Sequence, residues 1–121
     1  MLILDTNIII ELFKGNPETI KILTDINETF AISIVTSMEL YYGAINKREL
    51  NKIKIFLNDF KILPINEKIS QFALNLIENY SKSHGLNIPD ALIASTALYY
   101  NATLLTYNKK DFHYIKNLKM L

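Results

Sequence analysis

The sequence predicts an α/β protein with three layers, in which helices cover both faces of a mostly parallel central sheet of about four to five strands. Short apolar segments that suit strands alternate along the chain with longer segments of helical periodicity. Half of the residues are hydrophobic, and only three glycines and three prolines interrupt the 121 residues. This composition and length suit one hydrophobic core, so we expect a single domain over residues 1–121.

The N-terminal segment predicts one strand and two helices. Residues 2–4 are Leu-Ile-Leu, an apolar run typical of a central strand that is buried on both faces. Residues 7–14 predict a helix that Gly15 ends. A second helix is expected from Pro17 to about Ile26, because proline is favoured in the first turn of a helix.

The middle of the chain predicts two further strands and two further helices. Residues 29–35 are rich in β-branched and aromatic side chains and predict a strand that ends at Thr36 and Ser37. Residues 37–45 begin a helix, and Leu50, Ile53, Leu57 and Phe60 form a looser helical stripe after it. Residues 61–65 contain Pro64 and predict a short strand at an edge of the sheet.

The C-terminal half contains the clearest helix. Apolar residues recur at steps of three and four over residues 67–84, and Gly85 follows them. Residues 87–100 predict another helix, whose alanines would let it lie close to the sheet. Residues 102–106 form the last clear strand, and residues 107–121 predict a polar turn, a short helix and a final short strand.

Composition excludes several classes of protein. Thirteen basic residues against twelve acidic ones give a net charge of +1, which does not suit a strongly basic, non-specific nucleic-acid binder. Cysteine is absent, so thiolate metal sites are excluded and any metal must be held by oxygen or by the two histidines. The start of the chain lacks a basic signal-peptide segment, and no apolar run approaches the ~18 residues of a membrane span. We therefore expect a cytoplasmic protein.

Acidic side chains follow three of the predicted strands. Asp5 follows residues 2–4, Glu39 lies in the first turn of the helix after the second strand, and Asp111 lies beyond residues 102–106. The carboxyl ends of parallel strands meet at one edge of a sheet, so these three acids are expected there. Asp90 begins a helix that leads into a strand, and the pattern alone does not place it at that edge.

Each acid also has a purely structural interpretation. Asp5 can cap a helix, Thr36 and Glu39 match a capping box, Asp90 suits the start of a helix, and Asp111 suits a turn. Two unit charges ~4 Å apart interact by about 4 kcal/mol near a protein surface, however, so several carboxylates in one crevice would cost several kcal/mol, and a cation removes that penalty. Mg²⁺ or Mn²⁺ prefers such oxygen ligands, and it can activate water and bind phosphoryl oxygens.

Four segments, in this order and spacing, resemble a known family: ILDTNIII at 3–10, SIVTSMELYYGA at 33–44, IPDALIASTA at 88–97 and LLTYNKKDF at 104–112. The chain resembles the PIN domain, and within it the VapC-type toxins of bacterial and archaeal toxin–antitoxin pairs. The resemblance covers nearly the whole chain. It implies a PIN-like α/β/α fold and a ribonuclease that uses Mg²⁺ (or Mn²⁺) to hydrolyse RNA phosphodiester bonds.

The resemblance also implies site residues. The family's acidic metal ligands and catalytic residues match Asp5, Glu39, Asp90 and Asp111. Its polar residues that orient ligands or waters match Thr6, Asn7, Thr106 and Asn108. The loop that carries Asp111 varies among such proteins, and Asn108 is an alternative there. No serine–histidine or cysteine–histidine nucleophile is apparent, and His84 and His113 are expected to be exposed to solvent.

Partners follow from the same resemblance: an RNA substrate, a VapB-type antitoxin that blocks the site, and a homodimer that assembles further with the antitoxin. Residues 8–13 could line a groove for the antitoxin, although burial against the sheet explains about half of them. RNA phosphates could contact Arg48, Lys109 and Lys110, within the basic runs that also contain Lys47, Lys52, Lys54, Lys116 and Lys119. RNA bases could stack on Tyr41, Tyr42, Tyr107 and Phe112, although core packing explains at least half of these.

Two alternatives remain at this stage. The first is a binding module of the same fold that keeps the acids and lacks turnover. The second, less favoured, is a Mg²⁺-binding receiver domain, which would need a phospho-accepting aspartate after its third strand and paired acids after its first. The sequence leaves open which RNA is cleaved, how many ions bind, the oligomeric state and the identity of the antitoxin.

Overall fold

The computed structural model describes residues 1–121 and contains one five-stranded sheet that is parallel throughout. The strands, in chain order, are β1 (Leu2–Leu4), β2 (Phe30–Ser33), β3 (Lys61–Leu63), β4 (Thr103–Leu105) and β5 (Lys119–Met120). Their order across the sheet is β3-β2-β1-β4-β5. The predicted parallel α/β sheet is therefore confirmed, with β1 at its centre and the proline-containing segment at an edge.

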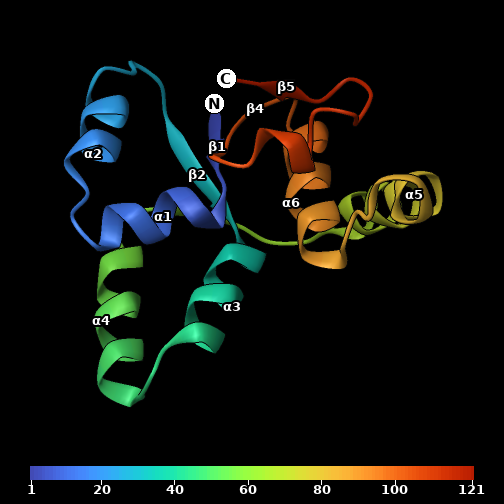
Figure 1. The fold of residues 1–121 in the computed structure, drawn as a ribbon. Helices are drawn as coiled ribbons and strands as arrows, with labels where there is room; N and C mark the ends of the chain where they lie inside the picture. Colours follow the sequence, from blue (N-terminus) through green and yellow to red (C-terminus); the bar gives the residue numbers. More distant parts are fainter.

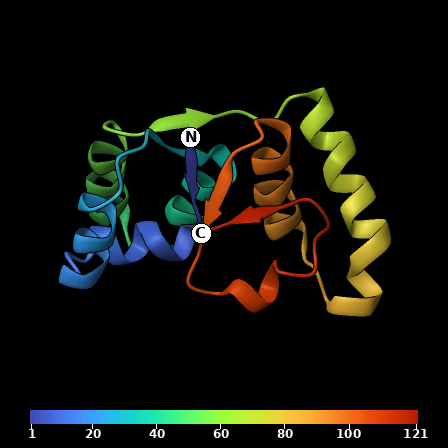
Figure 2. The same ribbon diagram turned by 90° about the horizontal axis from the view of Figure 1, so that it is seen from above.

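Helices cover both faces of this sheet. They are α1 (Thr6–Phe13), α2 (Pro17–Thr24), α3 (Ile34–Gly43), α4 (Lys47–Leu57), α5 (Glu67–His84) and α6 (Ile88–Tyr99), with a short 3-10 turn, η1 (Lys109–Asp111). In Figures 1 and 2, α5 and α6 lie on one side of β1 and β4, and α1, α2 and α4 lie on the other. None of the six helices combines the length and hydrophobicity that a membrane span requires.

The central strand joins two hydrophobic cores. Leu2 and Leu4 pack in the core on the α1 side, and Ile3 packs in the core on the α6 side. This is the alternation expected for successive residues of a strand. On the α6 side, Ala91 and Ala94 are fully buried, so their small side chains let the helix approach the sheet closely. These two cores, one on each face of the sheet, confirm the predicted three-layer arrangement.

The start of α3 differs from the prediction. The second strand ends at Ser33, and its hydroxyl oxygen accepts a hydrogen bond from the Val35 backbone N–H at 3.1 Å, which caps α3. The predicted capping box of Thr36 and Glu39 is therefore wrong: Thr36 is buried inside the helix, and Glu39 lies in its second turn. The β-branched pair Ile34 and Val35 suggested a longer strand, but the serine cap and the burial of Val35 override that preference.

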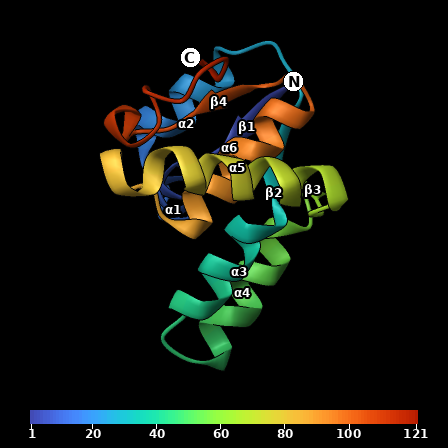
Figure 3. The same cartoon turned by 90° about the vertical axis from the view of Figure 1, so that its right-hand side faces the viewer.

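Two helices project away from the sheet. Figure 3 shows α3 and α4 as an arm below the sheet, with the connection between them at its tip.

Helix α5 has the predicted bounds. Asn66 caps its start and Gly85 ends it at a φ of +73°, a left-handed conformation that glycine adopts without strain.

Candidate active site

The carboxyl ends of β1 and β4 lie side by side and carry the first acid of the site. Asp5 directly follows β1, and its backbone N–H donates to the Leu105 carbonyl at the end of β4 at 2.9 Å. Its side chain is 5% exposed. The acid is therefore anchored at the middle of the sheet edge, where neighbouring elements can converge on it.

One pocket of about 220 Å³ brings the predicted acids together. Its lining is Asp5, Thr6, Asn7, Ile10, Glu39, Asp90, Asn108 and Asp111. We call it the acid pocket. Asp5, Glu39, Asp90 and Asp111 thus come from four separate segments to one place, and Asn108 borders the same space as Asp111.

Asp90 reaches this edge because of the direction of α6. The helix feeds into β4 after a short connection, so it ends near the first residue of that strand. A helix that lies against the sheet and runs antiparallel to the following strand must begin near the carboxyl edge. The sequence therefore contained the information that places Asp90, although the pattern of strand ends alone did not use it.

Three donors hold the Asp5 carboxylate. Its Oδ1 accepts from the Thr6 backbone N–H at 2.8 Å, and its Oδ2 accepts from the Thr106 hydroxyl at 2.7 Å and the Asn7 amide at 3.3 Å. Thr106 in turn accepts from the Asn7 amide at 3.2 Å and from the Asn108 backbone N–H at 3.0 Å. The single hydroxyl proton of Thr106 is thereby committed to Asp5, which fixes the orientation of the carboxylate.

A second chain of hydroxyls orients Glu39. The Thr6 hydroxyl donates to Glu39 Oε1 at 2.7 Å, and its oxygen lies 3.0 Å from the hydroxyl oxygen of Thr36. Because Thr6 has one proton to give, Thr36 must be the donor in the second contact. The buried Thr36 therefore acts through Thr6 on the glutamate.

The other two acids have free carboxylates. Neither Asp90 nor Asp111 makes a side-chain hydrogen bond, and the two ion pairs of the chain, Met1 with Glu28 and Lys14 with Glu11, involve none of the four acids. The acid pocket thus contains oriented carboxylates on one side and unpaired carboxylates on the other, without a neutralising basic side chain.

Burial and mutual repulsion shift the pKa values of this group. Burial raises the pKa of Asp5 although its hydrogen bonds oppose the shift, and the charges of Glu39 and Asp111 raise it further. Burial also raises the pKa of Asp90 to about 7, with added repulsion from Asp5, Asp111 and Glu39. Burial and the charges of Asp90 and Asp111 raise the pKa of Tyr114, a ring beside the acids.

The donor set fits a hard divalent cation. All of the charged groups in the acid pocket are carboxylates, and carboxylate oxygens are the ligands that Mg²⁺ and Mn²⁺ prefer. No three acidic or histidine side chains lie close enough together to enclose an ion by themselves. This spacing is compatible with Mg²⁺, which usually keeps several waters and is bound through one or two carboxylates.

The predicted basic residues lie in two different places. Lys109 and Lys110 are exposed on η1, directly between Asn108 and Asp111 of the acid pocket. Arg48 is exposed in the first turn of α4 and does not line the pocket. The two lysines are thus beside the acids, whereas the arginine is not.

The predicted aromatic residues also separate. Phe112 is 1% exposed and packs in the α6-side core, so its interpretation as a base-stacking residue is wrong. Tyr41 packs against the α1-side core, whereas Tyr42 is 95% exposed on the arm. The Tyr107 hydroxyl is hydrogen-bonded to that of Thr19. His84 and His113 are exposed, as expected.

Sequence reasoning missed one feature of this region. A smaller pocket of about 90 Å³ adjoins the acid pocket, and its lining is His84, Gly85, Leu86, Asn87, Asp90, Asp111 and Tyr114. Asp90 and Asp111 line both pockets. The two segments that meet here, residues 84–90 and 111–114, are far apart in the sequence, and no local pattern signals their contact.

The fold and the acid pocket define an α/β protein whose acidic residues meet at the carboxyl edge of a parallel sheet. The family model that matches this chain is the PIN domain, over residues 2–118. The chain belongs to the PIN domain family. The receiver-type alternative is left without support.

Full-length relatives and solved structures agree with this assignment. "Ribonuclease VapC2" of Rickettsia felis is 37% identical and is matched over 95% of this chain and 92% of its own length. A chain of the structure of VapBC2 from Rickettsia felis bound to a DNA fragment superposes with a TM-score of 0.84 at 32% identity, covering 99% of this chain and 96% of that one. A toxin–antitoxin complex from Klebsiella pneumoniae gives 0.81 at 32% identity, covering 98% and 95%.

Proposed function

We propose that this chain is a divalent-metal-dependent ribonuclease and the toxin of a VapBC-type toxin–antitoxin pair that acts in the cytoplasm. The observation that carries the proposal is the acid pocket, where four carboxylates share about 220 Å³ without a basic partner. The relatives support it, because several proteins named VapC ribonucleases match over nearly their whole length.

Asp5, Glu39, Asp90 and Asp111 would hold Mg²⁺ or Mn²⁺, one or two of them directly and the others through the waters of the ion, with Asn108 beside them. When bound, the ion lowers the pKa of a bound water and stabilises negative charge on the phosphoryl oxygens. The side chains of this protein supply orientation: Thr106 and Asn7 hold the Asp5 carboxylate, and Thr6 holds that of Glu39. Replacing a side chain that orients a metal ligand typically lowers metal affinity or activity 10- to 100-fold.

The exposed ammonium groups of Lys109 and Lys110 would contact the RNA phosphates that flank the cleaved bond. Their position between two residues of the acid pocket supports this role. Exposed lysines offset the negative charge of the acids at the rim and leave the carboxylates in the pocket available for a cation.

The antitoxin would bind in a groove beside the site. A pocket of about 260 Å³ between α1, α3 and α4 is lined by Ile10, Phe13, Leu40 and Ile53, among others. Ile10 and Glu39 line this groove and also the acid pocket. An apolar segment of the antitoxin seated there would therefore lie next to the acids and could block them.

A homodimer would use a different face. A wholly apolar pocket of about 240 Å³ lies between α5 and α6, and two of its lining residues, Leu74 and Ile88, are 63% and 67% exposed. Covering this surface would remove large apolar side chains from water. It lies on the α5–α6 side of the fold, whereas the antitoxin groove lies on the α1–α4 side.

The test is RNA cleavage by purified protein with Mg²⁺ or Mn²⁺ and with EDTA. Asp5→Asn should abolish cleavage while the circular dichroism spectrum stays unchanged, because the change keeps the shape of the side chain and removes its charge. Asp59→Asn is the matched control, since Asp59 is exposed and outside the pocket. RNA binding without cleavage would instead identify a binding module, and cleavage that survives EDTA would contradict the metal requirement.

A further inference from the structure

A stacked pair of rings forms one side of the smaller pocket beside the acids. The imidazole of His84 lies on the ring of Tyr114, with centroids 4.1 Å apart and planes inclined by 12°. Tyr80 packs against both rings at steeper angles, with centroids 5.8 Å from His84 and 5.2 Å from Tyr114. The three rings come from α5 and from the segment after η1.

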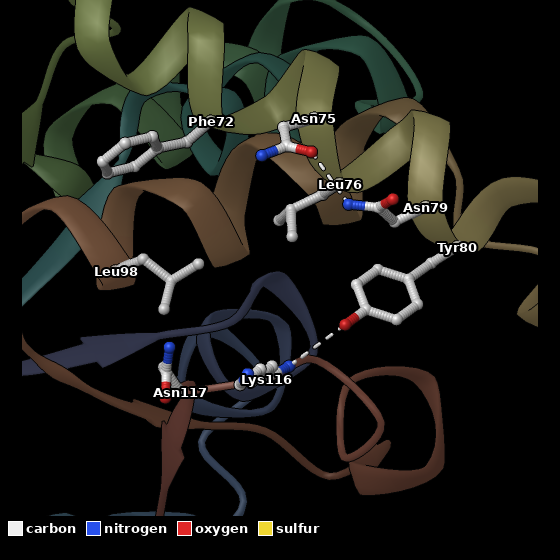
Figure 4. A pocket seen from close by; sticks show the side chains of 8 residues that line it. All are labelled: Phe72, Asn75, Leu76, Asn79, Tyr80, Leu98, Lys116 and Asn117. Carbon is white, nitrogen blue, oxygen red and sulfur yellow. Dashed lines mark hydrogen bonds between the residues drawn. The ribbon is translucent and has the colours of Figure 1, made fainter.

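The positions of Tyr80 and Tyr114 in this ring cluster are fixed by a hydrogen bond and by core packing. Figure 4 shows the Tyr80 hydroxyl accepting a hydrogen bond from the Lys116 backbone N–H, at 3.4 Å. This contact ties the segment that carries Tyr114 to α5. Ile115, next to Tyr114, is buried in the core. The position of the Tyr114 ring is therefore set by the fold before any ligand binds.

His84 presents the accessible surface of this pair. It is exposed, although Tyr114 stacks on one face of its ring and Tyr80 packs against it at a steep angle. Unpaired RNA bases are commonly bound by stacking on such flat side chains. A base cannot offer its face while it is stacked inside a duplex, so this surface suits single-stranded RNA.

A free hydrogen-bond donor lies in the same pocket. The side-chain oxygen of Asn87 accepts from the Asp90 backbone N–H at 2.9 Å and caps α6. The side-chain nitrogen of Asn87 makes no hydrogen bond within the chain, so its two N–H groups are available. The pocket of about 90 Å³ holds about three waters, which a ribose or a base edge could displace.

We propose that His84, backed by Tyr114, and Asn87 form a nucleoside-binding subsite that holds an unpaired RNA nucleotide next to the phosphate that is cleaved. The shared residues Asp90 and Asp111 carry the inference, because a ribose or a base edge in the smaller pocket has its phosphate beside the acid pocket. The proposal rests on the proposed function and adds a positioning element to it.

The kinetic test uses three variants and single-stranded RNA, with the oligonucleotide chosen as the one cleaved fastest from a randomised pool. His84→Ala should raise KM about tenfold and leave kcat nearly unchanged, the range expected when a stacking surface is lost. His84→Phe keeps a flat ring and should restore KM to within about twofold of the wild type. Tyr99→Ala is the matched control, because it removes an exposed ring that lies outside the pocket, and it should behave as the wild type.

A second experiment measures RNA binding alone, in a protein that should not cleave the RNA. In the Asp5→Asn background, fluorescence anisotropy with the same RNA should show weaker binding for His84→Ala than for Tyr99→Ala. An unchanged KM and unchanged RNA affinity for His84→Ala, in an enzyme that still cleaves RNA, would overturn the subsite alone. His84→Phe behaving as His84→Ala would overturn stacking. A wild type that cleaves no RNA would overturn the proposed function and the subsite together.

Discussion

Replacing Asp90 with asparagine should stabilise the metal-free protein at pH 8 while it destroys activity. Asp90 is a partly buried carboxylate without a hydrogen-bond or ion-pair partner for its side chain, and burial and the neighbouring acids raise its pKa from 3.8 to about 7. Asparagine occupies nearly the same volume and carries no charge. The repulsion from Asp5, Asp111 and Glu39 is therefore removed with little change in packing.

The sign of the pH dependence follows from the two protonation states. Between about pH 4 and pH 7 the folded chain keeps a proton on Asp90 that the unfolded chain has lost, so the free energy of unfolding falls as pH rises across this window. Above the pKa of Asp90 in the folded chain, this loss of stability is complete. Asp5, whose pKa is also raised, acts in the same direction and leaves a residual slope in the variant.

The difference between the folded and unfolded pKa values of Asp90 sets an upper limit on how much Asp90→Asn can raise the free energy of unfolding. At 1.36 kcal/mol for each pKa unit, the rise from 3.8 to about 7 corresponds to about 4 kcal/mol. Asp90 is only partly buried and solvent screens its charge, which lowers the expected gain at pH 8 to ~1–2 kcal/mol. This is about 4–8 °C in Tm for a chain of this size.

Thermal unfolding in EDTA at pH 4 and pH 8 measures the effect. Asp90→Asn should unfold at a higher temperature than the wild type at pH 8 and at nearly the same temperature at pH 4. Saturating Mn²⁺ should then stabilise the wild type more than the variant, by about 2.7 kcal/mol at 100 times Kd. If Asp90→Asn is less stable than the wild type in EDTA at pH 8, the electrostatic account of the pocket is wrong.

Three further changes test the surroundings of the site. Thr6→Val removes the hydroxyl that orients Glu39, and it should weaken Mn²⁺ binding about 10- to 100-fold in a calorimetric titration; unaltered affinity would contradict that role. Joint replacement of Lys109 and Lys110 by alanine should weaken RNA binding and flatten its dependence on salt concentration, as measured by fluorescence anisotropy. Phe13→Ala should reduce antitoxin affinity in a pull-down while a folded protein still cleaves RNA, and undiminished binding would place the antitoxin elsewhere.

Much of the fold could be predicted because its signals are local. The bounds of α5 follow from its helical periodicity and from Gly85, which ends it in a left-handed conformation. The central position of β1 follows from three consecutive apolar residues that pack on both sides. Each of these signals lies within a few residues of the structure that it specifies.

The boundary of β2 could not be predicted, because two local signals conflict there. The β-branched residues Ile34 and Val35 favour a strand, whereas the hydroxyl of Ser33 favours a helix start. Packing of Val35 in the α6-side core decides between them, and that packing depends on residues far away in the sequence.

Some residues of the site could likewise be placed from local signals, and others depend on the packing of distant segments. Asp5 and Asp111 could be placed at the sheet edge because Asp5 directly follows β1 and Asp111 lies in the segment after β4, whereas Asp90 required the direction of α6. The stack of His84 on Tyr114 depends on the path of the segment after η1, which no periodicity in the sequence describes. The roles of the four acids in binding a metal stay predictions that measurement must test.

The most direct test of the central claim is a calorimetric titration of Mn²⁺ into metal-free protein at pH 7.5 or above, about where Asp90 ionises. We expect saturable binding by the wild type and by Asp59→Asn, and none by Asp5→Asn. Heat of binding that is the same in all three proteins, or absent from the wild type, would contradict the claim that these carboxylates form a divalent-metal site.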